Sequence, residues 1–420
     1  MRADLVIRNA REILTCRGPA PRRGALQAET APLSNASVAG LDGRIVFVGP
    51  AADCGRAVEP TENARVIDAD GCTVVPGFVD AHTHAVYAGD RRAELRRRLA
   101  GATYAEIAAE GGGILETVAA TRGCAEDALV ETGRARLAEM ARCGTTTVEV
   151  KSGYGLSTEG ELKMLRAVRA LSERQPLLLV PTFLGAHEIP AEHRAGREAY
   201  VRLVAEEMIP RVAAERLAVW CDVFCDEGAF TVDESRRILE AGRRAGFGLR
   251  VHAEELAPSG GARLAAAAGA RSADHLIYVT REDARALAAA GTVATLLPAA
   301  AFYLKLGRFA PARMLIDEGV AVALGTDLNP GGGFSPSMPF AITLACFGMG
   351  MTLEEALVAA TINAAFSLDV HRVAGSLEPG KQFDAVVVDG SPVELLRVGA
   401  AAVRAVIVRG RVVHDTAGVS

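Results

Sequence analysis

The sequence lacks a hydrophobic run long enough to cross a bilayer. Half of its 420 residues are apolar, yet the apolar segments are short and interrupted, whereas a membrane-spanning helix needs about 18 to 20 consecutive apolar residues. Residues 1–5 already alternate as in a strand, and no apolar segment with a small-residue cleavage site resembles a secretory signal. We therefore expect a cytoplasmic protein that has no membrane partner.

Basic tracts and paired cysteines are also missing. The formal net charge of −5 is spread along the chain, without the cluster of Lys and Arg that would follow a phosphate backbone. The eight cysteines are scattered, and the closest pair, Cys221 and Cys225, has no second Cys or His pair to complete a zinc knuckle. We therefore expect no nucleic-acid partner, and reduced thiols that pack in the core.

Short strands bounded by Gly and Pro occur at both ends of the chain. Apolar alternation predicts strands at residues 4–8, 36–40, 44–48 and 64–68, and the pattern returns within 375–389 and 403–413. Strands from both termini can pair in one sheet, because the termini of a domain often lie close together. We expect a small β-sandwich domain made of residues 1–75 and 369–420.

Between these ends, apolar β-rich segments alternate with segments of helical period, which is typical of a parallel sheet with crossover helices. The expected strands are residues 77–83, 145–151, 177–184, 218–224, 248–253, 272–277, 292–297 and 320–325. The expected helices include residues 159–171, 197–209, 232–245 and 281–290. Eight such units predict an α/β fold, a (β/α)8 barrel over residues 76–368, whose chemistry lies on the loops that follow the strands.

Polar residues follow the carboxyl ends of these expected strands. In chain order they are His82 and His84, then Glu149, Lys151 and Tyr154, then His187, then His252 and Glu255, then Asp274 and His275, and finally Asp327 and Asn329. Since the carboxyl ends of parallel strands meet at one mouth of a barrel, we expect these side chains to form a single site.

A metal site is the chemistry that these residue types favour. His82 and His84 are two apart on a strand, so their side chains leave the same face and can hold one ion. Together with His252 and Asp327 they suit Zn²⁺ or iron with one position left for water, whose pKa the metal lowers to about 7. We predict one metal ion per chain, Zn²⁺ or Fe²⁺/Fe³⁺, held by these four residues.

Three residues are candidates for proton transfer. Asp327 can accept a proton from water, and Glu255, three residues after His252, can pass a proton to a leaving nitrogen. His275 can polarise the attacked carbonyl or orient the water; alternatively, it is a hydrogen-bond partner of Asp327.

Lys151 leaves a second arrangement open. A lysine at the end of a barrel strand can be carboxylated and bridge two metals, and such a site would include His187 and His275. Ion-paired lysines are more common, and the Ser-Gly-Tyr that follows indicates a substrate loop. We therefore expect one metal and an unmodified Lys151.

Arg91 lies nine residues beyond His82, where a guanidinium could bind a substrate carboxylate through two hydrogen bonds. From the residues alone, a solvated surface arginine is the more common alternative, because Arg92 and residues 96–98 give this segment a charged face.

Tyr154 and Asn329 offer neutral hydrogen bonds to a ligand. The glycine runs at 111–113 and 331–333 allow close backbone approach, but they lack the strand, lysine and Ser/Thr of a phosphate loop. Nucleotide binding is therefore not expected.

Seven segments of the sequence together indicate a protein family. They are PGFVDAHTHAVYAGDR (76–91), GATYAEIAAEGGGI (101–114), EVKSGYGL (149–156), TFLGAHEIP (182–190), HAEEL (252–256), SADHL (272–276) and GTDLNPG (325–331). In these segments the chain closely resembles the imidazolonepropionases of the amidohydrolase superfamily, and the resemblance runs through nearly the whole chain. EVKSGYGL followed by TEGELKMLR indicates this family in particular.

The resemblance implies a barrel with a small β-sandwich that hydrolyses the cyclic amide of 4-imidazolone-5-propanoate to N-formimidoyl-L-glutamate in histidine degradation, with zinc or iron bound. It implies the metal ligands His82, His84, His252 and Asp327, and the substrate contacts Arg91, Tyr154, His187, Glu255, Asn329, Gly331 and Gly332. It thus favours a carboxylate contact for Arg91. A homodimer is usual for the family.

One position departs from the family pattern, because many relatives carry Ser or Thr where this chain has Gly332. The missing hydroxyl removes a hydrogen bond of about 0.5–1.5 kcal/mol. The nearest alternative activity is that of a deaminase or of a hydrolase of a different cyclic amide. A barrel without catalysis is not expected, since all four metal-ligand residues are present.

Overall fold

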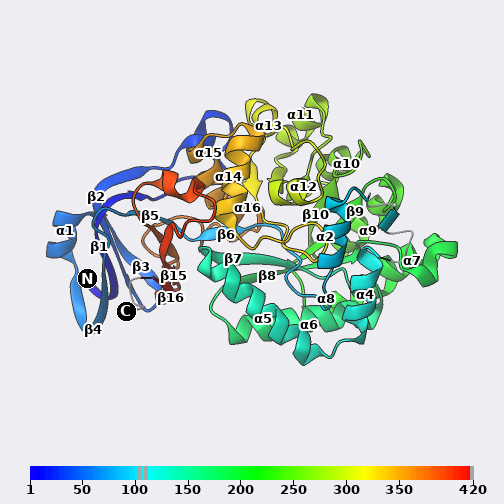
Figure 1. The fold of residues 1–420 in the computed structure, drawn as a ribbon, viewed down its shortest axis with the longest axis horizontal. Coiled ribbons are helices and arrows are strands. Elements are labelled where there is room, and N and C mark those ends of the chain that lie inside the picture. Colours follow the sequence, from blue (N-terminus) through cyan, green and yellow to red (C-terminus); the bar gives the residue numbers. More distant parts are fainter. Residues whose placement is uncertain (103–105, 108–111, 417–420) are drawn as a thin grey trace.

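The computed structural model describes residues 1–102, 106–107 and 112–416 and has two lobes (Figure 1). The segment 101–114 and the glycine run 111–113 therefore lie partly outside the described residues. Among the residues described, no helix combines the length and apolar character needed to span a membrane.

The larger lobe is built on a sheet of eight parallel strands, as the alternating pattern predicts. The strands are β6 (Phe78–Asp80), β7 (Thr145–Lys151), β8 (Leu178–Ala186), β9 (Trp220–Cys225), β10 (Gly248–Ala253), β11 (Ser272–His275), β12 (Val293–Leu296) and β13 (Val322–Leu324). They are neighbours in chain order. The predicted barrel is confirmed.

Hydrogen bonds just beyond the strands join the first strand to the last. The Asp327 amide donates to the His82 carbonyl at 2.9 Å, and the His84 amide donates to the Leu328 carbonyl at 2.9 Å. Thr83 and Leu328 form a parallel bridge. His82, His84 and Asp327 therefore lie directly on the seam that closes the barrel.

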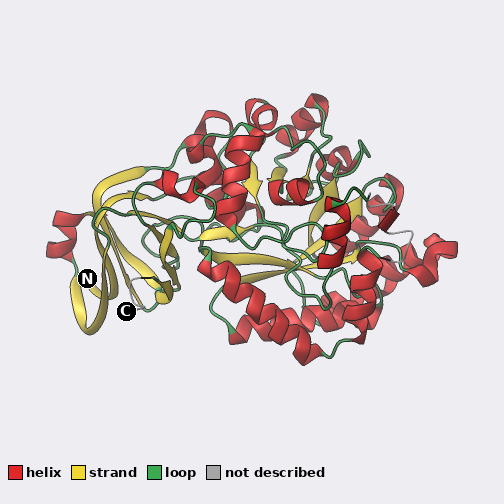
Figure 2. Ribbon diagram, viewed as in Figure 1, coloured by secondary structure: helices red, strands yellow, loops and turns green. Residues whose placement is uncertain are grey.

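Helices cover the outside of the barrel (Figure 2). They are α5 (Glu126–Arg142), α6 (Thr158–Arg174), α7 (Arg197–Arg202), α8 (Ile209–Ala214), α9 (Val232–Arg244), α10 (Gly261–Ala267), α11 (Arg281–Ala290), α12 (Pro298–Tyr303), α13 (Ala312–Asp317), α14 (Met338–Met349), α15 (Leu353–Ala359) and α16 (Ile362–Ser367), with α2 (Arg92–Leu99) and α4 (Ile114–Gly123) near the mouth. The helix expected over 197–209 is confirmed in α7 and α8, which a π-helical turn, Leu203–Met208, joins.

Local sequence signals explain where two of these helices begin. Thr231 before α9 and Thr280 before α11 each accept a hydrogen bond from the backbone N–H three residues on, at Glu234 and Asp283, whose carboxylates accept from the threonine N–H in return. This reciprocal pair satisfies backbone donors that a helix start leaves unpaired.

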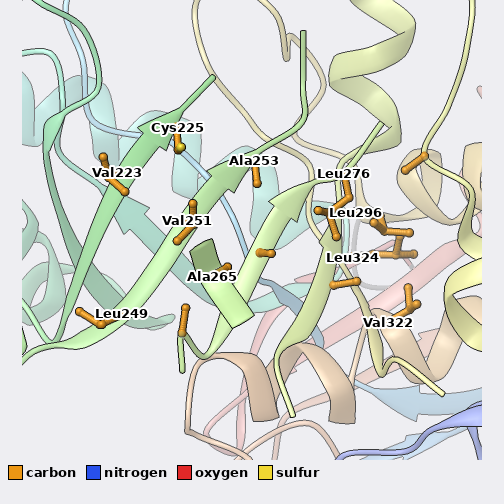
Figure 3. Packing of buried hydrophobic residues seen from close by; sticks show 14 of the residues in the cluster. Val223, Cys225, Leu249, Val251, Ala253, Ala265, Leu276, Leu296, Val322 and Leu324 are labelled. Atoms are coloured by element: carbon orange, nitrogen blue, oxygen red, sulfur yellow. The ribbon is translucent and has the colours of Figure 1, made fainter. Parts of the chain in front are cut away.

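The strands alternate in what they present to the two sides of the sheet. In β10, Leu249, Val251 and Ala253 belong to the large apolar cluster between sheet and helices (Figure 3). A Cβ atom placed on Gly261 of α10 would lie 2.9 Å from the Cβ of Ala253, so helix and strand are in close contact there. Because side chains alternate along a strand, His252 of the same strand faces the barrel interior.

The smaller lobe is a separate mixed sheet that contains strands of both termini, as expected. Its strands are β1 (Arg2–Leu14), β2 (Pro32–Leu41), β3 (Arg44–Pro50), β4 (Glu59–Asp68), β5 (Thr73–Pro76), β14 (Ala385–Val388), β15 (Val403–Val408) and β16 (Arg411–Asp415), with a short helix α1 (Ala51–Ala57). A β-bridge between Arg44 and Gln382 joins strand β3, at one edge of the sheet, to the segment that precedes β14. The sheet thus curls around one apolar core, which includes Ile7, Ile45 and Ile407.

One segment of the first seventy-five residues packs on the barrel rather than on the small sheet. The Gln27 side chain donates to the Val322 carbonyl at 2.9 Å and accepts from the Val322 amide at 3.1 Å. Asn363 of α16 donates to Gln27 at 3.0 Å. The domain bounds at 75/76 and 368/369 stay a prediction, and this contact belongs to the interface between the two lobes.

Candidate active site

Four side chains from three separate places in the chain converge at the carboxyl end of the barrel. Nitrogen atoms of His82, His84 and His252 lie within 4.8 Å of one another, and His82, Asp327 and His275 form a second such group. The Asp327 Oδ1 atom lies 3.5 Å from His82 Nε2 and 3.6 Å from His84 Nε2. The structure therefore brings together the four residues expected to bind a metal.

The burial and protonation of these nitrogen and oxygen atoms suit the binding of a divalent cation. His82 Nε2, His252 Nε2 and Asp327 Oδ1 are buried, and none has a hydrogen-bond partner in the part of the chain that is described. Burial holds the pKa of His82 and His84 well below the ordinary value, so both rings are neutral and keep a lone pair for a metal. Burial raises the pKa of Asp327 to about 7, and a bound cation would favour the carboxylate instead.

Two further carboxylates lie behind the histidines. Asp274 Oδ2 is 2.7 Å from His82 Nδ1, and Asp222 Oδ2 is 3.0 Å from His252 Nδ1. A carboxylate on the second ring nitrogen fixes the tautomer and orientation of a ligating histidine. Asp222 was not among the predicted site residues; its signal is an acid facing the barrel interior from the middle of an apolar strand.

Lys151 is fully buried in the same region. Its Nζ donates to Glu149 Oε1 at 2.6 Å and to Asp222 Oδ2 at 2.7 Å. Burial alone would lower the pKa of Lys151, but Asp222 and Glu149 together raise it above the ordinary value. Lys151 is thus held in two buried ion pairs, and the choice between an unmodified lysine with one metal and a carboxylated lysine with two stays a prediction.

Glu255 and His275 face each other beside the metal-ligand group, with Glu255 Oε2 3.5 Å from His275 Nε2. Burial and the nearby Asp327 and Asp226 carboxylates raise the pKa of Glu255 well above its ordinary value. Asp226 Oδ2 accepts from the amides of Glu255 and Leu256 at 2.7 and 2.9 Å. Asp226 was not predicted, and it holds the loop that carries Glu255.

Four non-glycine residues at the ends of these strands have left-handed backbone: Glu254 at φ 51°, His275 at φ 73°, Leu276 at φ 58° and Asp327 at φ 51°. Such conformations cost roughly 1–3 kcal/mol each and cluster at functional sites. Here they turn the chain abruptly at the ends of β10 and β11 and after β13.

Tyr154 and His187 complete one wall of the site. The rings of His84 and His187 are stacked with centroids 4.9 Å apart, and the Tyr154 ring lies 5.3 Å from that of His187. Burial lowers the pKa of His187 to about 3, so this ring is neutral at neutral pH. Its Nδ1 lies 3.0 Å from the Gly153 carbonyl.

The loop that carries Tyr154 is held by a buried carboxylate that the sequence did not single out. Glu161 accepts from the amides of Gly153, Gly155 and Leu156 at 2.8 to 3.2 Å. Gly155 also packs so closely on Gly160 that a Cβ atom would lie 2.3 Å from the Gly160 carbonyl carbon. The signal was present in the TEGELKMLR segment, where Glu161 lies on the helix that follows the loop.

Arg91 is buried, with only 6% of its surface exposed. Its Nη2 donates to Glu94 at 2.7 Å, and a Cβ atom on Gly331 would lie 2.2 Å from its Nη1. The surface position suggested by the charged segment is therefore wrong for Arg91, whereas the side chain of the next residue, Arg92, is 83% exposed. Burial follows because the guanidinium turns toward the loop after β13.

Asn329 organises that loop. Its Oδ1 accepts from the amides of Gly331 and Gly332 at 2.8 and 2.6 Å, and its Nδ2 donates to the Asp327 carbonyl at 2.7 Å. A Cβ atom on Gly332 would lie 3.3 Å from Leu304, so a larger residue there would press on that side chain. The backbone of 331–333 is thereby set beside Arg91.

The chain matches the profile of the amidohydrolase family over residues 73–413. It is similar to the imidazolonepropionase of Symbiobacterium thermophilum, with 52% identity over 98% of this chain and 97% of that protein. It is also similar to the imidazolonepropionase of Geobacillus kaustophilus, with 48% identity over 91% of each. Among solved structures, an adenosine deaminase from Xanthomonas campestris with bound zinc aligns with a TM-score of 0.72 and 19% identity, over 98% of this chain and 93% of that one. The last similarity shows the fold alone.

Proposed function

The chain belongs to the imidazolonepropionase family of amidohydrolases, and from that premise we propose that it hydrolyses 4-imidazolone-5-propanoate to N-formimidoyl-L-glutamate in histidine degradation. The observation that carries the proposal is the 52% identity over 98% of the chain to an imidazolonepropionase. In the reaction, water adds to the ring carbonyl carbon, the cyclic C–N bond breaks, and the leaving nitrogen takes up a proton.

The metal is one Zn²⁺ or iron ion held by His82, His84, His252 and Asp327. The buried, unpartnered nitrogen and oxygen atoms described above support this ligand set, as does the zinc bound to the structurally similar deaminase. When bound, such an ion makes water nucleophilic at neutral pH and polarises a carbonyl.

The propionate of the substrate binds to Arg91. A guanidinium matches a carboxylate with two parallel charge-assisted hydrogen bonds, and Glu94 holds this one in place. The imidazolone ring then lies toward His187 and Tyr154, whose neutral rings offer stacking surface, with backbone groups of Gly331 and Gly332 and the amide of Asn329 at the loop.

Two carboxyl groups with opposite tasks move the protons. Asp327 accepts a proton from the attacking water, and Glu255 donates its proton to the ring nitrogen that leaves, the task for which a raised pKa suits it. His275, 3.5 Å from Glu255, orients the attacked carbonyl. The proton that Asp327 took from water then passes through solvent to Glu255, and the second water proton leaves from the new carboxylic acid, so both residues end as they began.

The test is the loss of imidazolone absorbance with purified enzyme, measured before and after treatment with a chelator and again after zinc or iron is restored. We expect ring opening that the chelator abolishes and the metal restores. A purine or a neutral cyclic amide serves as the comparison substrate, because a neutral ring has no carboxylate to bind Arg91. Faster turnover of the neutral compound would replace this proposal by the deaminase or general cyclic-amidase alternative.

We place the enzyme in the cytoplasm as a homodimer. Eight free cysteines, all in the described part of the chain, suit a reducing compartment. Sedimentation measures the oligomeric state, and a monomer at micromolar concentration would contradict the dimer.

A further inference from the structure

Lys151 occupies the centre of a charged cluster beneath the metal-ligand group. Its side chain and those of Glu149, Asp222 and Asp274 are completely buried. The Nζ atom lies 2.6 Å from Glu149, 2.7 Å from Asp222 and 3.7 Å from Asp274. Desolvation makes such a cluster costly, and a buried ion pair contributes little net stability against apolar side chains of the same volume.

The two aspartates lead to two different metal-ligand histidines. The same Asp222 Oδ2 that accepts from Lys151 lies 3.0 Å from His252 Nδ1. Asp274 Oδ2 lies 2.7 Å from His82 Nδ1. In both histidines the other ring nitrogen, Nε2, is buried without a hydrogen-bond partner among the described residues. The His82–Asp274 contact is a hydrogen bond, whereas the His252–Asp222 contact has ion-pair distance without hydrogen-bond geometry.

Asp274 and Asp222 differ in how many other groups contact their carboxylates. Asp274 also accepts from Arg250 at 3.2 Å and from Ser272 at 2.6 Å. For Asp222, Lys151 is the sole Lys or Arg within ion-pair distance in the part of the chain that the structure describes. Loss of the lysine should therefore disturb His252 more than His82.

We propose that Lys151 is a positioning residue of the metal centre: through Asp222 and Asp274, its ammonium fixes His252 and His82 with Nε2 toward the metal. This inference rests on the metal site of the proposed function. It goes beyond that function by assigning metal affinity to a residue that touches neither metal nor substrate.

The test compares Lys151→Met and the double variant Glu149→Gln/Lys151→Met with the wild-type enzyme. The double variant removes one positive and one negative charge, so the net charge of the cluster is unchanged. Leu287→Ala, in the apolar layer of α11 and not a member of the charged cluster, is the control for a general loss of stability. Circular dichroism and thermal melting establish that each metal-free protein is folded.

Two measurements on the folded proteins report the metal centre directly. Competition with a chelator gives the dissociation constant for Zn²⁺, and the visible absorption of the Co²⁺-loaded protein reports ligand geometry. Loss of a histidine's supporting carboxylate contact typically weakens metal binding by about 10 to 100 fold. We expect that loss and a changed Co²⁺ spectrum in both Lys151 variants, and wild-type values in Leu287→Ala.

Unchanged affinity and spectrum in a folded Lys151 variant would overturn the proposal. Failure of both variants to fold, while Leu287→Ala folds, would also overturn it, because the lysine would then serve the fold instead of the site. If the wild-type protein itself bound neither Zn²⁺ nor Co²⁺, the proposed function would fail as well. The two ideas are thereby tested separately.

Discussion

The two faces of β10 differ sharply although they belong to one six-residue strand. Leu249, Val251 and Ala253 face the helices and join the apolar layer (Figure 3). Arg250 and His252 face the interior, where Arg250 is fully buried and paired with Asp274 at 3.2 Å. The apolar face stabilises the fold by burial, whereas the polar face carries the groups to which we assign the chemistry. Residues that stabilise the fold therefore alternate along this strand with residues that face the site.

The largest effect on activity is expected from an interior ligand. In Asp327→Ala the site loses the one carboxylate among the four proposed ligands, so metal binding and turnover should fall together, turnover by about 10³ fold or more. Asp317→Ala on α13, whose side chain is 56% exposed, is the control and should match the wild type. Full turnover by Asp327→Ala would remove this residue from the mechanism.

The next largest effect is expected from the proton donor. Glu255→Gln should keep the metal and lower kcat by about 10² to 10⁴ fold. Because burial raises the pKa of Glu255, the donating form is present below that pKa and is lost as the pH rises through it. The alkaline limb of the wild-type pH–rate profile should therefore be absent in the Gln variant.

Glu240→Gln on α9, at an exposed position, is the control for that experiment. An unchanged kcat and an unchanged alkaline limb in Glu255→Gln would assign proton donation to another residue, with His275 the first to examine.

A smaller effect, mainly on KM, is expected from the substrate clamp. Charge-assisted hydrogen bonds contribute about 1.5–3 kcal/mol, so Arg91→Ala should raise KM by roughly 10 to 100 fold. Arg92→Ala is the matched control, because that neighbouring side chain is 83% exposed. Equal KM values for the two variants would show that the propionate binds elsewhere.

The smallest effect on activity is expected from the apolar layer. Leu287→Ala removes a fully buried side chain from α11 and should lower the free energy of unfolding by about 2–5 kcal/mol. Denaturant unfolding measures that loss, and kcat and KM at 25 °C should stay at wild-type values. A large fall in kcat of the folded variant would mean that the two faces are not separable.

The sequence predicted the barrel because two periodicities are written along the chain itself. Apolar β-rich segments alternate with segments of helical period. Polar residues follow most of the predicted strands, in the order of the chain. The single site at one mouth then follows from parallel strands alone. Residues such as His84 and His252, far apart in sequence, could be grouped in this way without knowing any distance.

What the sequence could not supply is which side chains face each other across the barrel. The contacts of Lys151 with Asp222, and of Asp274 with His82, join different strands and depend on how far each side chain reaches. The sequence around Arg91 has the composition of an exposed helix face, and its burial depends on contacts such as those with Glu94 and Gly331, which the sequence does not reveal.

The most direct test of the account is the number of metal ions per chain, measured by elemental analysis of the purified, dialysed protein and located by anomalous diffraction. We expect one ion per chain, bound by His82, His84, His252 and Asp327, because these interior side chains lie close enough to share it. Two ions per chain, with Lys151 carboxylated between them, or a single ion bound away from these four residues, would contradict it.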